Sequence, residues 1–257
     1  MEAAATIAGK YTLVRKVGAS AIAEVFLARF AGKDGKVDQV LLRRVLPDLA
    51  RNDQFSQLFQ KVTDVMSGLQ HPNVLRILEV GDDPAANGRF TVTEFIQGQS
   101  LRRVQEAARR KGGLHLAHAL GIVLDLARGL HYAHERKDAN GYAIGIVHGD
   151  VAPGNVILGY DGIAKIQDFG MVWVEAAVPA TDPSLLTEKF PYMSPERVCG
   201  APLDRRSDLF SLALVLYELI TGIPTFQAAT PKELMARIVD CKPALPSSVK
   251  EGFPPEL

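Results

Sequence analysis

The segment from Ile146 to Gly170 constrains the fold of this chain more than any other, because it combines strand signals with polar residues at fixed places. An apolar run, Val156-Ile157-Leu158, predicts a short strand, and Tyr160-Asp161-Gly162 predicts the tight turn after it. Residues 163–167 then form the returning strand. We therefore expect a β-hairpin that carries polar residues to one edge of a small sheet.

Three polar residues of this segment can hold a metal ion or handle a proton. Asp150 and Asn155 lie on a turn that Pro153 and Gly154 interrupt, and Asp168 leaves the second strand. Two carboxylates and an amide at one sheet edge suit a magnesium–phosphate complex, because Mg²⁺ prefers hard oxygen ligands and keeps bound waters. Any one of these residues alone would more simply end a turn, so the interpretation depends on the set.

The same segment resembles the catalytic and metal-binding loops of eukaryotic-type protein kinases. His148-Gly149-Asp150 stands where that family has His-Arg-Asp, Asn155 follows at the family's spacing, and Asp168-Phe169-Gly170 matches its Asp-Phe-Gly tripeptide. The resemblance to bacterial serine/threonine kinases of this type covers nearly the whole chain, and it includes Ser194-Pro195-Glu196. It implies ATP and Mg²⁺ as cofactors, Asp150 as the catalytic residue, and Asn155 and Asp168 as the metal ligands.

The hydrophobic pattern fits the two-lobed α+β fold that this resemblance implies. We expect a small lobe over residues 1–97, with a five-stranded antiparallel sheet and one helix, and a mainly helical large lobe over residues 98–257. The expected strands cover residues 11–17, 24–29, 37–45, 74–80 and 89–95, and the expected helices cover residues 53–69, 101–111, 116–134 and 207–221. Residues 172–190 show little periodicity and are expected to form an exposed loop.

The sequence ends before the last helices of the family's large lobe, so we expect this lobe to be truncated at its C-terminus. The arginine that pairs with Glu196 in the family would lie in the missing region. Apolar surface around Leu203 and Leu209 is then expected to be exposed. Either the chain is a fragment of a longer protein, or its large lobe is unusually short.

By resemblance, the nucleotide would contact six positions: Gly18, Val25, Arg43, Glu94, Ile96 and Ile157. Neighbouring positions depart from the family's pattern. Ser20 and Ala23 replace two glycines of the glycine-rich loop, and their Cβ atoms make close approach of the backbone to phosphate harder. Leu41 replaces a usual alanine, so it either fills part of the adenine slot or, as the better interpretation, packs as a core residue.

The ion pair that anchors ATP in the family is altered at both of its positions. Arg43 stands in place of the lysine, which keeps the charge but brings a bulkier, planar group, and a partly solvated strand arginine is an equally good interpretation. Arg44 is expected on the other face of the strand. Val62 stands in place of the glutamate that orients the lysine. Losing a positioned partner lowers the rate by orders of magnitude, because phosphoryl transfer depends on positioning and electrostatics.

The catalytic loop also lacks two cations. Ala152 replaces a lysine that in many members reaches the transferred phosphate, and Gly149 replaces the arginine that meets an activation-loop phosphate. Phosphorylation of Thr181, Ser184 or Thr187 would therefore lack its usual cationic partner. We interpret these three hydroxyls as ordinary loop residues.

Composition excludes several other classes of function. Lys+Arg and Asp+Glu are both 29, so nothing favours nucleic acid or an anionic membrane as a partner. Cys199 and Cys241 have no metal or disulfide spacing and read as free thiols of a reducing, cytoplasmic protein, and no apolar run is long enough to span a membrane. Four histidines are expected to be solvated or to cap helices: His115, His118, His131 and His134.

Two functions remain open from the sequence. The first is a pseudokinase that binds or scaffolds a signalling protein, because the changes at Ser20, Ala23, Leu41, Arg43 and Val62 all fall on the small-lobe side of the nucleotide. The second is an active or weakly active serine/threonine kinase with a protein substrate, because a pure scaffold has no chemical need for the intact aspartates and asparagine.

Overall fold

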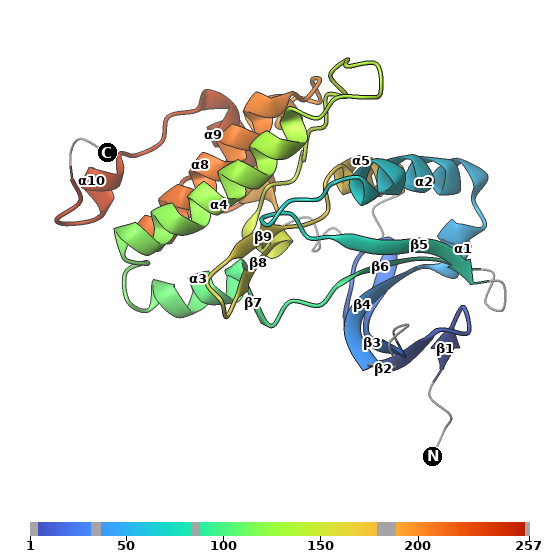
Figure 1. The fold of residues 1–257 in the computed structure, drawn as a ribbon. Helices are drawn as coiled ribbons and strands as arrows, with labels where there is room; N and C mark the ends of the chain where they lie inside the picture. Colours follow the sequence, from blue (N-terminus) through green and yellow to red (C-terminus); the bar gives the residue numbers. More distant parts are fainter. Residues whose placement is uncertain (1–4, 32–36, 84–87, 179–188, 255–257) are drawn as a thin grey trace. The chain divides into compact units, whose positions relative to one another are not determined.

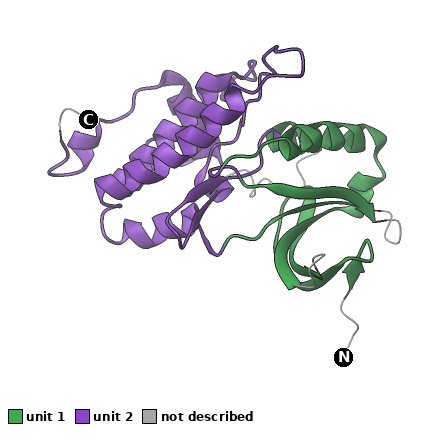
Figure 2. Ribbon diagram, in the orientation of Figure 1, with its two compact units in different colours: residues 1–71, 75–96, 171–182 green, residues 72–74, 97–170, 183–257 purple. Residues whose placement is uncertain are grey.

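The computed structural model describes residues 5–31, 37–83, 88–178 and 189–254 (Figure 1). The chain divides into two compact units, coloured separately in Figure 2. Unit 1 comprises residues 1–71, 75–96 and 171–182, and unit 2 comprises residues 72–74, 97–170 and 183–257. The lobe boundary expected after residue 97 stays a prediction.

Unit 1 is built on a six-stranded antiparallel sheet with the strand order β1-β2-β3-β4-β6-β5. Its strands are β1 (Thr6–Ile7), β2 (Tyr11–Ala19), β3 (Ala23–Ala31), β4 (Val37–Val45), β5 (Ile77–Asp83) and β6 (Gly88–Glu94). The five longer strands confirm the expected sheet. The two-residue β1 adds a sixth strand at the edge, and it is too short for any alternation pattern to indicate it.

Strand β4 shows how the sheet divides its residues between two faces. Val40 and Leu42 are fully buried and belong to a core cluster with Tyr11 and Phe90. Leu41 points to the opposite face, because successive side chains of a strand alternate, and it is only half-buried. Leu42, and not Leu41, is therefore the core leucine of this strand.

Helix α2 (Asp53–Ser67) packs its apolar side against a second core cluster of unit 1. The helix begins at Asn52, whose side chain accepts a hydrogen bond from the Phe55 backbone N–H at 2.9 Å. Phe55 and Phe59 are buried on its inner side, and the short helix α1 (Pro47–Ala50) precedes it. The expected helix over residues 53–69 is confirmed, with an end that differs by two residues.

The expectation of an exposed loop is wrong for residues 172–176, because they belong to helix α5 (Met171–Ala176). Met171 and Val174 are buried in the same cluster as Phe55 and Phe59. Their spacing of three places both side chains on one side of the helix, and burial of that side outweighs the weak periodicity of so short a segment. Helices α2 and α5 lie side by side in unit 1 (Figure 1).

Unit 2 contains a three-stranded antiparallel sheet in the order β7-β8-β9, formed by β7 (Gly98–Ser100), β8 (Val156–Gly159) and β9 (Ala164–Ile166). Strands β8 and β9 are the hairpin expected from the sequence. The turn between them contains Gly162 at a φ of 85°, a conformation that suits glycine. The turn closes where the Gly162 N–H donates to the Gly159 carbonyl at 3.0 Å.

The rest of unit 2 is mainly helical in the residues that the structure describes. Its helices are α3 (Leu101–Arg109), α4 (Leu116–His134), η1 (Pro153–Asn155), η2 (Phe190–Tyr192), α7 (Pro195–Val198), α8 (Arg205–Thr221), α9 (Pro231–Asp240) and α10 (Pro246–Val249). Helices α4 and α8 pack together, and their buried residues include Leu126, Leu130 and Val215. None of the described helices is both long and apolar enough to cross a membrane.

Two expectations for the end of unit 2 have different outcomes. Leu209 is 51% exposed, as expected for apolar surface in this region. Glu196, in contrast, has a partner within the chain, because the Ser207 hydroxyl donates a hydrogen bond to its carboxylate. A neutral hydroxyl is therefore a partner of this carboxylate, and the expected loss of the family's arginine stays a prediction.

Candidate active site

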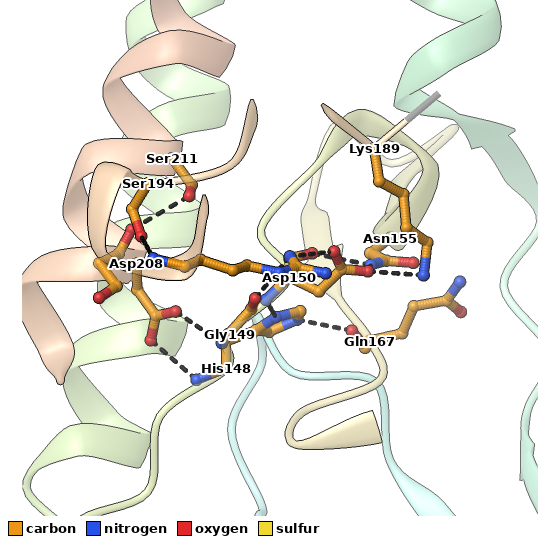
Figure 3. Close-up of polar contacts among 11 residues, drawn as sticks. His148, Gly149, Asp150, Asn155, Gln167, Lys189, Ser194, Asp208 and Ser211 are labelled. Carbon is orange, nitrogen blue, oxygen red and sulfur yellow. Dashed lines mark hydrogen bonds and ion pairs between the residues drawn. The ribbon is translucent and has the colours of Figure 1, made fainter. Parts of the chain in front are cut away.

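Asp150 is the centre of a polar network in unit 2 (Figure 3). Its Oδ1 accepts a hydrogen bond from Arg197 Nη1 at 2.6 Å, and its Oδ2 lies 2.8 Å from both Lys189 Nζ and Asn155 Nδ2. The carboxylate is 5% exposed, so these contacts replace most of its hydration. They occupy three of the roughly four hydrogen-bonding positions that a carboxylate offers.

The charges around Asp150 determine its protonation state. Burial alone would raise the pKa of the Asp150 carboxyl, but the positive charges of Lys189 and Arg197 outweigh burial and lower this pKa to about 2. The carboxylate is therefore ionised at neutral pH. A carboxylate this acidic is a weak proton acceptor, so its chemical strength lies in orienting a hydroxyl group by a hydrogen bond.

Asp208 holds the backbone of the turn before Asp150. This carboxylate, on helix α8, is 1% exposed and accepts hydrogen bonds from the N–H groups of His148 and Gly149, each at 2.8 Å. His134 Nε2 lies 2.8 Å from the same carboxylate, and its side chain is 6% exposed. His134 is therefore a buried partner of Asp208, and the expectation of a solvated or capping histidine is wrong for this residue.

His148 joins the turn to the end of strand β9. Its Nδ1 accepts a hydrogen bond from the Asp150 N–H at 3.1 Å, so its Nε2 carries the hydrogen and donates to the Gln167 carbonyl at 2.7 Å (Figure 3). The ring contacts Phe169 with centroids 4.7 Å apart. The Gln167 N–H also donates to the Asn155 carbonyl at 3.0 Å. These contacts hold the segments of Asp150, Asn155 and Asp168 together.

Two residues of the site, Gly149 and Asp168, have a positive φ. Gly149 has a φ of 76°, in the left-handed region that glycine adopts without strain. Asp168 has a φ of 67°, and a non-glycine residue in this region stores strain of about 1 kcal/mol or more. Strain of this kind occurs preferentially at functional sites, which agrees with the position of Asp168.

Asn155 and Asp168 offer the oxygen atoms that a magnesium ion prefers. The Asn155 amide nitrogen donates to the carbonyl and to Oδ2 of Asp150, both at 2.8 Å, which fixes the amide and leaves its oxygen as an acceptor. No group of three or more His, Cys, Asp or Glu side chains in the described ranges is placed to hold a metal ion. One amide oxygen and one carboxylate are hard oxygen donors of the kind that Mg²⁺ accepts together with phosphate and water, and metal binding at Asn155 and Asp168 stays a prediction.

The nucleotide-contacting residues expected in unit 1 form a short ladder across three strands. Gly18 on β2 is the register partner of Val25 on β3, and Val25 is the register partner of Arg43 on β4. Arg44 pairs with Glu24 at 2.8 Å and lies over the ring of Phe26, so it serves a different face, as expected. The sheet thus brings Gly18, Val25 and Arg43 together.

Val62 packs against the apolar cluster around Phe59, Met171 and Val174. It follows Phe55 and Phe59 at helical spacing on the inner side of α2. A carboxylate at this position would lie against hydrocarbon. The position where the family's ion-pairing glutamate is expected to be missing therefore lies in apolar surroundings.

The remaining expected nucleotide contacts are Glu94, Ile96 and Ile157. Glu94 ends strand β6, and its Oε1 accepts a hydrogen bond from the Arg76 N–H at 2.9 Å. Ile96 follows in unit 1, and Ile157 is a half-buried residue of strand β8 in unit 2. The nucleotide roles of these residues stay predictions. Thr181, Ser184 and Thr187 lie outside the described residues.

The fold and the network around Asp150 define a kinase-like α+β protein, and solved structures agree. The kinase domain of PknI from Mycobacterium tuberculosis superposes with a TM-score of 0.70 and 28% identity, covering 98% of this chain and 86% of that one. A kinase domain model matches residues 11–254, and the chain belongs to the protein kinase domain family.

Curated relatives are bacterial kinases. The chain is 33% identical to the tyrosine-protein kinase MasK of Myxococcus xanthus over 97% of its own length, and 29% identical to the serine/threonine-protein kinase PrkC of Bacillus subtilis over 95%. It spans only 38% and 36% of the length of these relatives.

Sequence reasoning did not identify Lys189 and Arg197 as site residues. Both lie close to Ser194-Pro195-Glu196, which was recognised only as a family signature. The available signal was the absence of cations at Gly149 and Ala152, since a buried carboxylate needs positive partners from elsewhere.

Proposed function

We propose that this kinase domain is a pseudokinase with a damaged ATP anchor, which acts in signalling by binding or scaffolding a protein. The observation that carries this proposal is the position of Val62 against the apolar cluster of unit 1. The family relies on a carboxylate at this position to orient the cation that holds the nucleotide phosphates.

The surroundings of Val62 support a lasting loss of the ion pair. Met171 and Val174 of helix α5 are buried in the cluster that Val62 packs against. Val62 is itself partly buried, so a charged side chain at this position would lose part of its hydration, which is unfavourable for an unpaired charge. Arg43 keeps a positive charge on strand β4, but Val62 offers it no carboxylate.

A transfer assay tests this proposal directly. Purified protein is incubated with γ-labelled ATP, Mg²⁺ and mixed serine, threonine and tyrosine acceptors, because the names of MasK and PrkC include both acceptor classes. We expect no transfer above that of the Asp150→Asn variant. Transfer above this control would overturn the pseudokinase proposal.

A thermal-shift titration separates loss of binding from loss of chemistry. A ligand that binds only the folded state raises the melting temperature by mass action, so ATP with Mg²⁺ should produce no rise in the wild type. Arg43→Lys alone should not restore a rise, whereas Arg43→Lys combined with Val62→Glu restores the pair that the family uses. A rise with Arg43→Lys alone would show that the missing carboxylate is irrelevant to binding.

The network around Asp150 favours a second candidate function, an active or weakly active protein serine/threonine kinase. In this reaction the acceptor hydroxyl oxygen forms a bond to the γ-phosphorus, and the bond from that phosphorus to the bridging oxygen of ADP breaks. The Asp150 carboxylate orients the hydroxyl by a hydrogen bond, and the hydroxyl proton is released to water. Asn155 and Asp168 would hold Mg²⁺, which would neutralise charge that develops on the phosphate oxygens.

The partner in either case is a protein, as a substrate or as a signalling partner. The balanced charge of the chain gives no reason to propose nucleic acid. The two cysteines, Cys199 and Cys241, are free and exposed, which agrees with a reducing, cytoplasmic setting for this domain.

A further inference from the structure

The turn between strands β2 and β3 is closed by its own polar groups. The Ser20 N–H donates a hydrogen bond to the Ala23 carbonyl at 2.8 Å, and the Ile22 N–H donates to the Ser20 hydroxyl oxygen at 3.4 Å. By resemblance, this turn is the glycine-rich loop, whose backbone covers the phosphates of a nucleotide. Two N–H groups of the loop therefore have acceptors within the turn itself.

Ile22, at the tip of this turn, is a core residue of unit 1. It is 1% exposed and belongs to the apolar cluster that contains Phe55 and Phe59 of helix α2. Its carbonyl accepts a hydrogen bond from the Leu46 N–H at 2.9 Å, so the backbone of the tip is held as well. The tip of the loop is thus anchored in the unit by both its side chain and its main chain.

The backbone of the turn does not need the glycines that the family resemblance implies. Ser20 and Ala23, which both lie in a described range, do not have a positive φ. A Cβ atom built on Gly18 would meet no described atom within 4 Å. The turn therefore suits ordinary residues with side chains, and its conformation does not depend on glycine.

Helix α5 is anchored in the same apolar cluster as Ile22. Met171 and Val174 are buried there, and the helix lies beside α2 (Figure 1). The helix directly follows Asp168-Phe169-Gly170, and residues 171–182 belong to unit 1 although this tripeptide belongs to unit 2. The cluster that holds the loop tip therefore also fastens the segment after the tripeptide to unit 1.

We propose that Ile22 and helix α5 form a latch in unit 1: the tip of the glycine-rich loop and the segment after Asp168-Phe169-Gly170 share one apolar cluster and are released together. Protein interiors are close-packed, so a loop that opens and withdraws Ile22 leaves α5 without part of its packing surface. The coupling is reciprocal by linkage, so removal of α5 also frees the loop. The latch concerns packing within unit 1 and does not depend on whether the domain transfers phosphate.

The alternative is that Ile22 and α5 each contribute to the core without affecting one another. Two reporters separate these cases. Trp173 lies on α5, is 41% exposed and is the only tryptophan of the sequence, so quenching of its fluorescence by acrylamide follows the helix. The Leu46 N–H donates to the Ile22 carbonyl, so its hydrogen exchange follows the loop.

The first measurement is amide hydrogen exchange of α5 in the full chain, together with quenching of Trp173. Ile22→Ala should speed exchange of α5 by about 50-fold and make Trp173 more accessible to acrylamide, because the variant loses three buried carbon atoms. Ile22→Val loses one carbon atom and should speed exchange by about fourfold. Val14→Ala, at an exposed valine of β2, is the control that should change neither reporter.

The second measurement tests the coupling in the opposite direction. Val174→Ala on α5 should speed exchange of the Leu46 N–H by about tenfold. The matched control is Val92→Ala, which removes the same two carbon atoms from the other core cluster of unit 1. This control should leave exchange of the Leu46 N–H close to that of the wild type.

Independent contributions to the core predict a different pattern. The latch is overturned if α5 exchanges at the wild-type rate in Ile22→Ala, or if Val174→Ala and Val92→Ala have the same effect on Leu46. If Ile22→Ala does not fold, Ile22→Val decides by the same two reporters. Phosphate transfer by the wild type would overturn the pseudokinase function and leave the latch standing, so the two proposals fail separately.

Discussion

Two regions of this domain have changed in opposite ways, although the family uses both for one reaction. Around Asp150 in unit 2, Lys189 and Arg197 contact the carboxylate, whereas Gly149 and Ala152 of the catalytic loop carry no charge. Around Val62 in unit 1, the position that lost a carboxylate is surrounded by apolar side chains of α2 and α5. The Asp150 region therefore contains paired charges, whereas the partly buried Val62 lies in apolar surroundings.

The difference follows from what each region does for folding. Asp150 is buried beside a loop that Asp208 holds by its backbone, so its charge must be balanced for the domain to be stable. Val62 sits on the inner side of a helix, where an apolar side chain contributes to the core. Loss of a charge at Val62 can therefore stabilise the fold, whereas loss of charge around Asp150 cannot.

The largest expected effect comes from the carboxylate that supports the catalytic turn. Asp208→Ala leaves the buried N–H groups of His148 and Gly149, and the ring of His134, without their acceptor. We expect the free energy of unfolding to fall by about 3–5 kcal/mol. Urea denaturation measures it, with the exposed Asp240→Ala as the matched control. A loss below about 1 kcal/mol would show that the Asp208 carboxylate contributes little to the stability of the catalytic turn.

Val62→Glu is expected to have the next largest effect. A carboxylate placed against the apolar cluster should lower the free energy of unfolding by about 1–3 kcal/mol. Val65→Glu, on the exposed side of the same helix, should change it by less than about 0.5 kcal/mol. If the two variants melt at the same temperature, position 62 tolerates a charged side chain. The Val62 region would then not differ from the Asp150 region in its tolerance of charge.

The pH dependence of stability tests the charged region. The pKa of Asp150 is about 2 in the folded protein against an ordinary value of 3.8, so ionised Asp150 stabilises the fold. This contribution, about 2 kcal/mol, is fully present above pH 3.8 and is lost as the pH falls through 2. The deficit of Asp150→Asn relative to wild type should therefore shrink between pH 4 and pH 2. A constant deficit over this range, like that of the exposed control Asp48→Asn, would contradict it.

The smallest effect is expected on the surface of unit 1. The hydrogen bonds from Arg44 and Lys16 lower the pKa of Glu24, but all three side chains are partly exposed. Glu24→Gln should lower the free energy of unfolding by about 0.2–1 kcal/mol, and the loss should diminish in high salt. A salt-independent loss above 2 kcal/mol would show that charge matters as much here as around Asp150.

The sequence predicted the fold well where local signals were strong. The hairpin of β8 and β9 follows from an apolar run and a turn with Gly162, and helix α4 covers the residues expected from its pattern. The proximity of Asp150 and Asn155 could also be predicted, because both residues lie on one short turn of the chain. Short segments such as β1 and α5 were missed, since their burial depends on residues far along the chain.

The parts of the site that depend on long-range contacts could not be predicted. His134 looked like a surface histidine, because its helix shows no sign that Asp208 lies 2.8 Å away. Lys189 had no local signal at all, since its partner is 39 residues earlier in the chain. Local patterns specify where an element begins and which side is apolar, but they do not specify which distant charge meets it.

The contact between Lys189 and Asp150 has a consequence for how silent and working kinases are told apart. A column-by-column comparison of catalytic loops records an alanine at residue 152 and counts the chain as one cation short. Counting the charges around Asp150 gives a different answer, because the Lys189 ammonium lies 2.8 Å from its carboxylate. Surveys that sort degenerate kinases by motif alone would therefore miss a positive charge that reaches the aspartate from a later segment of the chain.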